Sequence, residues 1–293
     1  MTFRNDFEKT EARAERRGGG GRTIALGGGG LGSIVLIGLY LLLGGDPGQL
    51  NQLTRGDSSQ GAIEQSQTQD NCKTGEDANN SVDCRIEFTG ISLDRVWQDQ
   101  LANQAGIEYT RPKIVLFSGG TSTGCGTASS STGPFYCPAD ETAYFDATFF
   151  DTLAQMGGGS GPLAQEYVVA HEFGHHIQKL EGTLGRIDYN NPGPESDAVK
   201  LELQADCYAG IWAHYADEGP DRILEPLSDE QVSDALETTR AIGDDTIQKH
   251  NGGDIQPDLW THGSSEDRMN SFLAGYKSGQ MAQCDTLDRG VYR

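Results

Sequence analysis

Residues 162–180 read PLAQEYVVAHEFGHHIQKL, and this stretch decides how the rest of the chain is interpreted. Pro162 suits the first turn of a helix and Gly182 suits its end, so the pattern predicts a helix over the whole stretch. With histidines counted as neutral, Glu172 is the only charged residue between positions 168 and 177. A helix with such an apolar centre is expected to lie buried in a folded domain.

The run HEFGH within this helix has the spacing of a metal site. His171 and His175 are four residues apart, so their rings project from one face of a helix. Two imidazoles placed in this way can bind one Zn²⁺ ion. Glu172 lies beside them, where its carboxylate can take a proton from a metal-bound water. Two core histidines satisfied by hydrogen bonds are the alternative, but the pattern favours one zinc ion per chain with Glu172 as the general base.

A catalytic zinc site needs a third protein ligand and an open fourth position. No histidine follows His175 at the spacing of the HExxHxxGxxH pattern. The run LELQADCYAG at 201–210 instead offers Glu202 and Asp206, four residues apart on a predicted helix and among apolar neighbours. We expect Glu202 to bind the metal and Asp206 to accept the free ring N–H of His171, which would fix the orientation of that ring. A solvated acidic helix face is the alternative.

The order of the other elements predicts an α+β domain. Helices are expected at 92–105, 196–216, 228–243 and 264–276, strands at 113–117 and 143–146, and a Gly/Ser/Thr-rich loop at 118–134.

The N-terminal part of the chain has a different composition. No residue from Thr23 to Leu43 is charged, and a helix of that length spans roughly 30 Å, the thickness of the apolar core of a bilayer. Residues 1–22 carry six basic and four acidic side chains, whereas the whole chain has a net charge of −21. The positive-inside rule therefore predicts a single-pass anchor at 23–43 in the cytoplasmic membrane, with residues 1–22 as a cytosolic tail and the remainder outside. A cleaved signal peptide is the alternative.

Residues 44–85 are polar and lack an apolar period, which predicts a flexible linker ahead of a folded domain over 86–293. All six cysteines follow the apolar run, as expected in a compartment where disulfides form. A local clip, a bridge that closes the Gly/Ser loop, and a bridge from the Glu202 helix to the C-terminal tail are the predicted disulfides: Cys72–Cys84, Cys125–Cys137 and Cys207–Cys284.

HEFGHHIQ and the downstream ELQADCYAGIWA together resemble the bacterial neutral zinc metallopeptidases that have an N-terminal membrane anchor, and more widely the glutamate-zincin peptidases. The similarity extends through GCGTASSSTGPFYCPAD, AYFDATFF and THGSSEDR to the C-terminal cysteine segment, so it covers nearly the whole chain. The resemblance implies a zincin-like domain with His171, His175 and Glu202 as zinc ligands and Glu172 as the general base. It also implies an edge strand at 144–147, on which an extended peptide substrate can pair, and an ordinary core strand is the alternative.

These observations predict an enzyme that hydrolyses peptide bonds with a zinc-activated water. His262, in a loop before the last predicted helix, is the candidate for stabilising the oxyanion, and a loop histidine that only caps or solvates is the alternative. Two other functions remain open: a zinc amidase that acts on cell-wall peptide, and a non-catalytic module in which zinc joins two helices. The intact Glu172 disfavours the module. The predicted partners are a peptide or protein substrate and the membrane, and the acidic charge argues against nucleic acid.

Overall fold

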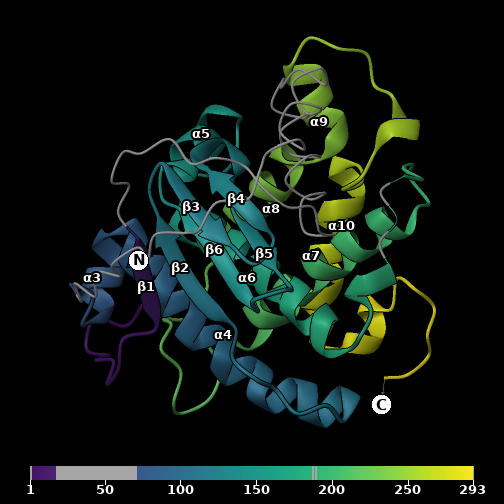
Figure 1. Cartoon of the computed structure of the whole chain (residues 1–293). Coiled ribbons are helices and arrows are strands. Elements are labelled where there is room, and N and C mark those ends of the chain that lie inside the picture. The colour runs from purple at the N-terminus through teal and green to yellow at the C-terminus, as the bar shows by residue number, and fades with distance from the viewer. Residues whose placement is uncertain (1, 18–70, 187, 189, 293) are drawn as a thin grey trace.

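The computed structural model describes residues 2–17, 71–186, 188 and 190–292 (Figure 1). The helices are α3 (Gly75–Asn80), α4 (Val82–Ala105), α5 (Phe149–Gln155), α6 (Pro162–Leu180), α7 (Asp197–Tyr215), α8 (Asp229–Ala241), α9 (Asp244–His250) and α10 (Ser265–Ser278). The strands are β1 (Ala14–Arg17), β2 (Lys113–Phe117), β3 (Gly120–Thr123), β4 (Gly126–Ser129), β5 (Phe135–Cys137) and β6 (Thr142–Asp146). The α+β class predicted from the sequence is confirmed.

A four-stranded sheet lies at the centre of the fold, with the strand order β1-β2-β6-β5. β1 and β6 are parallel to β2, and β5 is antiparallel to β6. Side chains alternate between the two faces of the sheet, as strand geometry requires. In β2, Ile114 and Leu116 join the main core with α4 and α6, whereas Val115 and Phe117 join a smaller core under the β3–β4 hairpin.

Helix α6, which carries the HEFGH run, is central among the helices. It packs against α4, α7 and α8, and it also contacts β5. Helices α7 to α10 gather on the side of α6 that faces away from β1 (Figure 1). α7 and α10 are in close contact because glycines face each other's backbones: a Cβ atom on Gly275 would lie 1.9 Å from the carbonyl oxygen of Cys207, and one on Gly210 would lie 2.0 Å from that of Phe272. These contacts hold α7 in a fixed position beside α6.

Several predicted helices are confirmed closely. α6 has the predicted bounds, and α7, α8 and α10 begin after serine N-caps whose hydroxyls accept backbone N–H groups, as N-capping requires. The N-capping serines are Ser196, Ser228 and Ser264. The helix expected to begin at residue 92 begins at Val82 instead. Gly90 allows this longer helix to lie against β2, because a Cβ atom there would be 2.3 Å from Ile114 Cδ1.

Two predictions about the sheet are wrong. The loop expected at 118–134 contains the β3–β4 hairpin and a short 3₁₀-helix at Ser130–Thr132. The edge strand expected at 144–147 is not at an edge, because β6 lies between β2 and β5. Among the described strands, β5 forms that edge of the sheet, next to α6.

The predicted domain limits are too narrow. Residues 2–17 pack against the domain and supply β1, although they were expected to form a separate tail. The described part of the expected linker at 44–85 is folded, because a capping box between Thr74 and Asp77 starts α3 and a disulfide joins Cys72 to Cys84. The membrane helix expected at 23–43 lies outside the described residues. Within those residues, no helix has both the length and the apolar character needed to cross a bilayer.

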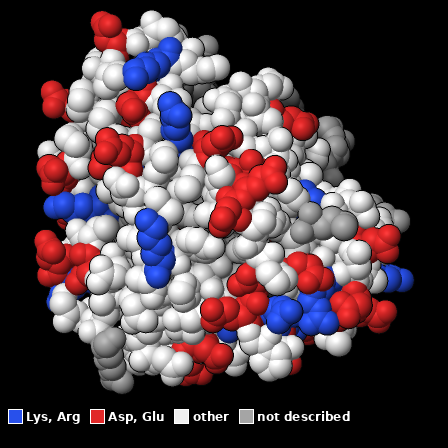
Figure 2. All heavy atoms as spheres, turned by 180° about the vertical axis from the view of Figure 1, so that it is seen from behind, with Lys and Arg blue, Asp and Glu red and all other residues white. Residues whose placement is uncertain are grey.

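Acidic side chains are spread over the face of the molecule seen in Figure 2, and basic side chains lie among them. The chain has 43 acidic and 22 basic residues, so a negative field surrounds the protein. Such a field repels anionic surfaces and polyanions and does not by itself select a peptide substrate.

Candidate metal centre

Helix α6 presents the HEFGH run from a buried position. Gly161 caps the helix in an extended conformation and Pro162 takes the first position, where its missing N–H costs nothing. His171 and His175 follow one helical turn apart, and the centroids of their rings are 4.8 Å from each other. Each histidine is only 7% exposed, so the two rings face a largely enclosed space.

Helix α7 brings Glu202 to the same place. Its Oε2 atom lies 3.2 Å from His171 Nε2, and its Oε1 atom lies 3.6 Å from His175 Nε2. One potential ligand atom from each of the three residues lies within 4.8 Å of the others. His171, His175 and Glu202 therefore come together as the sequence predicted, and they form a possible metal site.

Each histidine is held by a second contact through its other ring nitrogen. His171 Nδ1 lies 2.8 Å from Asp206 Oδ1, as predicted, so its N–H donates to that carboxylate. His175 Nδ1 lies 2.9 Å from Gln178 Oε1. The amide of Gln178 donates in turn to the carbonyl oxygen of Leu201 at 2.6 Å, which fixes which end of the amide faces the ring. Both Nε2 atoms are thereby left free to face Glu202 and a metal.

A buried cluster behind Asp206 was not predicted from the sequence. Arg268 of α10 donates from Nε to Asp206 Oδ2 at 2.8 Å and from a terminal nitrogen to Oδ1 at 3.0 Å. The Tyr167 hydroxyl donates to Asp206 Oδ1 at 2.5 Å. Burial by itself would raise the pKa of Asp206, but Arg268 and His171 hold it below its usual value. Asp206 is therefore kept ionised as an acceptor for His171.

The charges at the site fit a cation. Burial by itself would lower the pKa of His171, but Asp206 and Glu202 raise it to about 10. Burial would also raise the pKa of Glu202, yet the neighbouring histidines lower it. Asp206 and Glu202 thus stabilise one positive charge at the site. That charge is a proton on His171 or a metal ion in place of the proton. Two imidazole nitrogens and one carboxylate oxygen are a donor set that suits Zn²⁺.

The three residues lie at the floor of a cleft that Glu172 shares. Burial raises the pKa of Glu172, and the nearby histidines and the backbone N–H of Tyr136 in β5 lower it in part. The cleft has an apolar wall from four parts of the chain: Phe149, Met156, Val168, Ile242 and Ile247. The cleft therefore combines a polar floor, which carries the possible ligands and a base, with a wall that suits an apolar side chain.

His262 lines the same cleft, although it is far from α6 and α7 in the sequence. Its Nδ1 atom lies 3.4 Å from Asp244 Oδ1. The other oxygen of Asp244 accepts the backbone N–H groups of Thr261, His262 and Gly263 at 2.8, 2.8 and 3.0 Å. Burial would lower the pKa of His262, but Glu202 and Asp244 raise it. Asp244 thus fixes the backbone of the loop and lies beside the ring, whose Nδ1 atom also lies 3.0 Å from the Thr261 hydroxyl. These contacts hold His262 at the cleft.

The other histidines do not line the cleft. His176 is buried, where its ring lies 2.8 Å from the Tyr136 hydroxyl and 2.6 Å from the carbonyl oxygen of Thr110. His214 bonds to the carbonyl oxygen of Tyr276, and His250 is exposed. These residues serve the structure or face solvent.

All three predicted disulfides are confirmed: Cys72–Cys84, Cys125–Cys137 and Cys207–Cys284. No cysteine of the described residues is free, and these six are all the cysteines of the chain. The bridge from Cys207 connects the helix that carries Glu202 and Asp206 to the C-terminal segment, which includes the short 3₁₀-helix Met281–Cys284. It therefore ties the helix that carries Glu202 and Asp206 to the end of the chain.

A helix that carries two histidines and a glutamate, with a carboxylate from a second helix beside them, is the pattern of HExxH zinc sites. Comparison with known families agrees. Residues 4–287 match the family described as "Putative neutral zinc metallopeptidase", and the chain belongs to this family.

Curated relatives come from distant bacteria. An uncharacterized protein of Mycobacterium tuberculosis H37Rv is 50% identical over 222 residues, which is 74% of each chain. The uncharacterized protein YpfJ of Escherichia coli K12 is 40% identical over 213 residues, 70% of this chain and 72% of YpfJ. No solved structure matches the chain.

Proposed function

We propose that the protein is a peptidase that hydrolyses peptide bonds with one Zn²⁺ ion held by His171, His175 and Glu202. The observation that carries this proposal is the convergence of three ligand atoms at the floor of an open cleft, with the Glu172 carboxylate beside them. An HExxH helix beside an edge strand supports a zincin-like arrangement. A zinc ion that only joined two helices would need neither the cleft nor the glutamate, so the structure favours catalysis over a non-catalytic module.

The residues around the ligands have separable roles in the proposed reaction. A bound zinc ion would act as a Lewis acid and lower the pKa of a coordinated water toward about 7. Glu172 takes the proton from the attacking water and passes it to the leaving amine, and its partly apolar surroundings raise its pKa toward the range that a general base needs. His262, held by Asp244, donates a hydrogen bond to the oxygen that becomes negative in the transition state.

The substrate is proposed to be an extended peptide with an apolar side chain near the cleaved bond. β5 is an edge strand of the sheet and lies beside α6, and the edge of a sheet can pair with an extended peptide through main-chain hydrogen bonds. The apolar wall of the cleft, which includes Phe149 and Ile247, can hold one side chain of that peptide. The three disulfides support a site of action outside the cytosol.

The variant Glu172→Gln tests the proposed chemistry. Glutamine keeps the shape of the side chain but cannot accept the proton, so peptide hydrolysis should fall by about 10²- to 10⁴-fold. Zinc content, measured by metal analysis of the same protein, should remain at the wild-type level. Glu195→Gln removes an exposed carboxylate outside the cleft and serves as the matched control. Wild-type turnover in the Glu172→Gln variant would show that Glu172 is not the base.

A further inference from the structure

The N-terminal segment Thr2–Arg17 is paired along its length with later parts of the chain. Strand β1 pairs in parallel with β2. Before it, the N–H of Lys9 donates to the carbonyl oxygen of Lys73 at 3.0 Å, and the N–H of Gly75 donates to that of Phe7 at 2.9 Å. At the start of the segment, the N–H of Glu225 donates to the carbonyl oxygen of Thr2 at 2.8 Å. The segment therefore shares backbone hydrogen bonds with three separate regions of the domain.

Two buried carboxylates of α4, Glu87 and Asp94, accept hydrogen bonds from the basic residues of the segment. Glu87 accepts the Lys9 ammonium group and the backbone N–H of Arg13, the latter at 2.7 Å. Asp94 accepts Arg13 at two positions, with Nε at 2.6 Å and a terminal nitrogen at 3.1 Å. Glu87 is fully buried and Asp94 is 3% exposed. With the segment in place, both carboxylates are shielded from water, and their charges are met by the basic residues of the segment.

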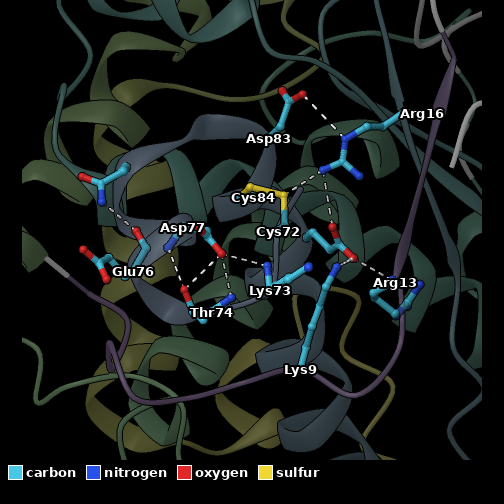
Figure 3. The surroundings of a disulfide bond; sticks show 12 residues. Lys9, Arg13, Arg16, Cys72, Lys73, Thr74, Glu76, Asp77, Asp83 and Cys84 are labelled. Atoms are coloured by element: carbon cyan, nitrogen blue, oxygen red, sulfur yellow. Dashed lines mark hydrogen bonds and ion pairs between the residues drawn. A yellow bond between two sulfur atoms is a disulfide. The ribbon is translucent and has the colours of Figure 1, made fainter. Parts of the chain in front are cut away.

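The disulfide Cys72–Cys84 lies beside this group of charges. A terminal nitrogen of Arg16 lies 2.9 Å from Cys72 Sγ and 3.4 Å from Glu87 Oε2 (Figure 3). The bridge ties residues 71–74, which pair with the segment, to the first turns of α4, which carry Cys84 and Glu87. This disulfide therefore holds residues 71–74 and the first turns of α4 together, and both of these parts contact the segment.

Apolar packing and close backbone contacts also hold the segment against the domain. Phe3 is 1% exposed and packs edge-on against Phe88 of α4, with ring centroids 5.8 Å apart. Position 75 has to be glycine here, because a Cβ atom would lie 1.9 Å from the carbonyl oxygen of Arg4. The Thr2 hydroxyl donates to Glu166, a fully buried residue of the active-site helix α6. The segment thus belongs to the same folded unit as the metal site.

We propose that residues 2–17 lie on the same side of the membrane as the catalytic domain, bound to the buried carboxylates Glu87 and Asp94 of α4. A bilayer core about 30 Å thick would prevent every one of these contacts if it separated the two parts. It would also remove the partners that the segment supplies to Glu87, Asp94 and Glu166, and it would expose the β2 edge. Arg17 and Asn71, the described residues on either side of this part of the chain, therefore lie on one side of the membrane. This arrangement replaces the cytosolic tail expected from the positive-inside rule.

Cysteine labelling in intact spheroplasts tests this proposal with the full chain. Because all six native cysteines are in disulfides, one added cysteine is the only free thiol. Glu11→Cys reports on the segment, because the Glu11 side chain is 70% exposed, and Asp258→Cys reports on the exposed surface of the domain. A membrane-impermeant maleimide should label both variants equally without lysis.

The outcomes of the labelling experiment separate the two arrangements. Labelling of Asp258→Cys in intact spheroplasts, with labelling of Glu11→Cys only after lysis, would overturn the proposal. Labelling of both variants only after lysis would support a shared side and would contradict a site of action outside the cytosol.

A cross-link tests the docking itself. Glu15 and Val115 are register partners in β1 and β2, so the pair Glu15→Cys with Val115→Cys should form a new disulfide in membranes after mild oxidation. The matched control is Glu15→Cys with Lys200→Cys, in which the second thiol lies on α7 and both thiols should stay free. Peptide mapping that found residues 15 and 115 unlinked and reactive in folded protein, with the three native disulfides intact, would overturn the proposal.

Discussion

Replacing Arg268 by methionine is predicted to destabilise the domain and to loosen the metal site together. Methionine has a similar length and fills the same buried space, but it removes the only fixed positive charge in contact with Asp206 among the described residues. The Arg268 side chain is 3% exposed and that of Asp206 is fully buried, so water cannot take the place of the guanidinium. Breaking a buried ion pair by removing one partner costs about 3–5 kcal/mol.

The remaining contacts of Asp206 narrow the expected loss in the free energy of unfolding. Asp206 keeps two donors in the variant, the Tyr167 hydroxyl and His171 Nδ1, so the lower end of the range, about 3 kcal/mol, is expected. That is a large part of the 5–15 kcal/mol by which a typical domain is stable. His171 also loses a firmly fixed acceptor, and a loss of this kind typically lowers metal affinity by about 10- to 100-fold.

The pH dependence of the loss follows from the pKa of Asp206. Arg268 and His171 hold that pKa below the unfolded value of about 3.9, against the effect of burial. A carboxyl group whose pKa is lowered by folding stabilises the protein above its unfolded pKa, and it loses this contribution as the pH falls toward the folded value. The difference between wild type and Arg268→Met should therefore be greatest near neutral pH and should shrink below about pH 4.

Urea unfolding of the metal-free protein at pH 7 and at pH 3, under non-reducing conditions, measures this difference. Arg240→Met is the matched control, because Arg240 is exposed and its side chain is outside the cleft. It should change the free energy of unfolding by no more than about 0.5 kcal/mol. A loss of the same small size in Arg268→Met at pH 7, or a loss that is equal at both pH values, would refute the role assigned to the ion pair.

Three further predictions concern the cleft and the helices that form it. His262→Asn should lower kcat by about 10²- to 10³-fold with little change in KM, because the lost hydrogen bond forms mainly in the transition state; an equal rise in KM would contradict this. The double variant Cys207→Ser with Cys284→Ser should lose about 4 kcal/mol in thermal or urea unfolding, since that bridge closes a long loop. Gly174→Ala should lose about 1–3 kcal/mol in the same assay, because its Cβ atom would lie 2.9 Å from the backbone of Ala205; a stabilised variant would show that α6 and α7 are not in such close contact.

The parts of the site that the sequence predicted are those set by local spacing. His171 and His175 lie one turn apart in any helix, and Glu202 and Asp206 do so in the next one. The apolar residues around both pairs indicate that these faces of α6 and α7 are buried. Because each apolar face is stabilised by packing against another element, the two helices are expected to meet there. Serine N-caps gave the starts of the later helices in the same way.

The parts that the sequence did not predict depend on contacts between distant residues. Arg268 is 62 positions from Asp206, and an arginine in the first turn of a helix gives no local sign that it is buried. The partner of His262 is Asp244, which in the sequence looks like an ordinary acidic residue at the start of a helix. Strand β1 was missed for a related reason: its alternating charges suggest a solvated tail until the buried carboxylates of α4 are known.

Titration of zinc into the metal-stripped protein tests the central claim, that His171, His175 and Glu202 hold one catalytic zinc ion. Hydrolysis of a mixed peptide library should be absent without metal, rise linearly with added zinc, and level off at one equivalent per chain. A double variant, His171→Ala with His175→Ala, should bind no zinc at the same concentrations and remain inactive, whereas His250→Ala should behave as wild type. Full activity in the metal-stripped protein, or unchanged zinc binding in the double variant, would contradict the account.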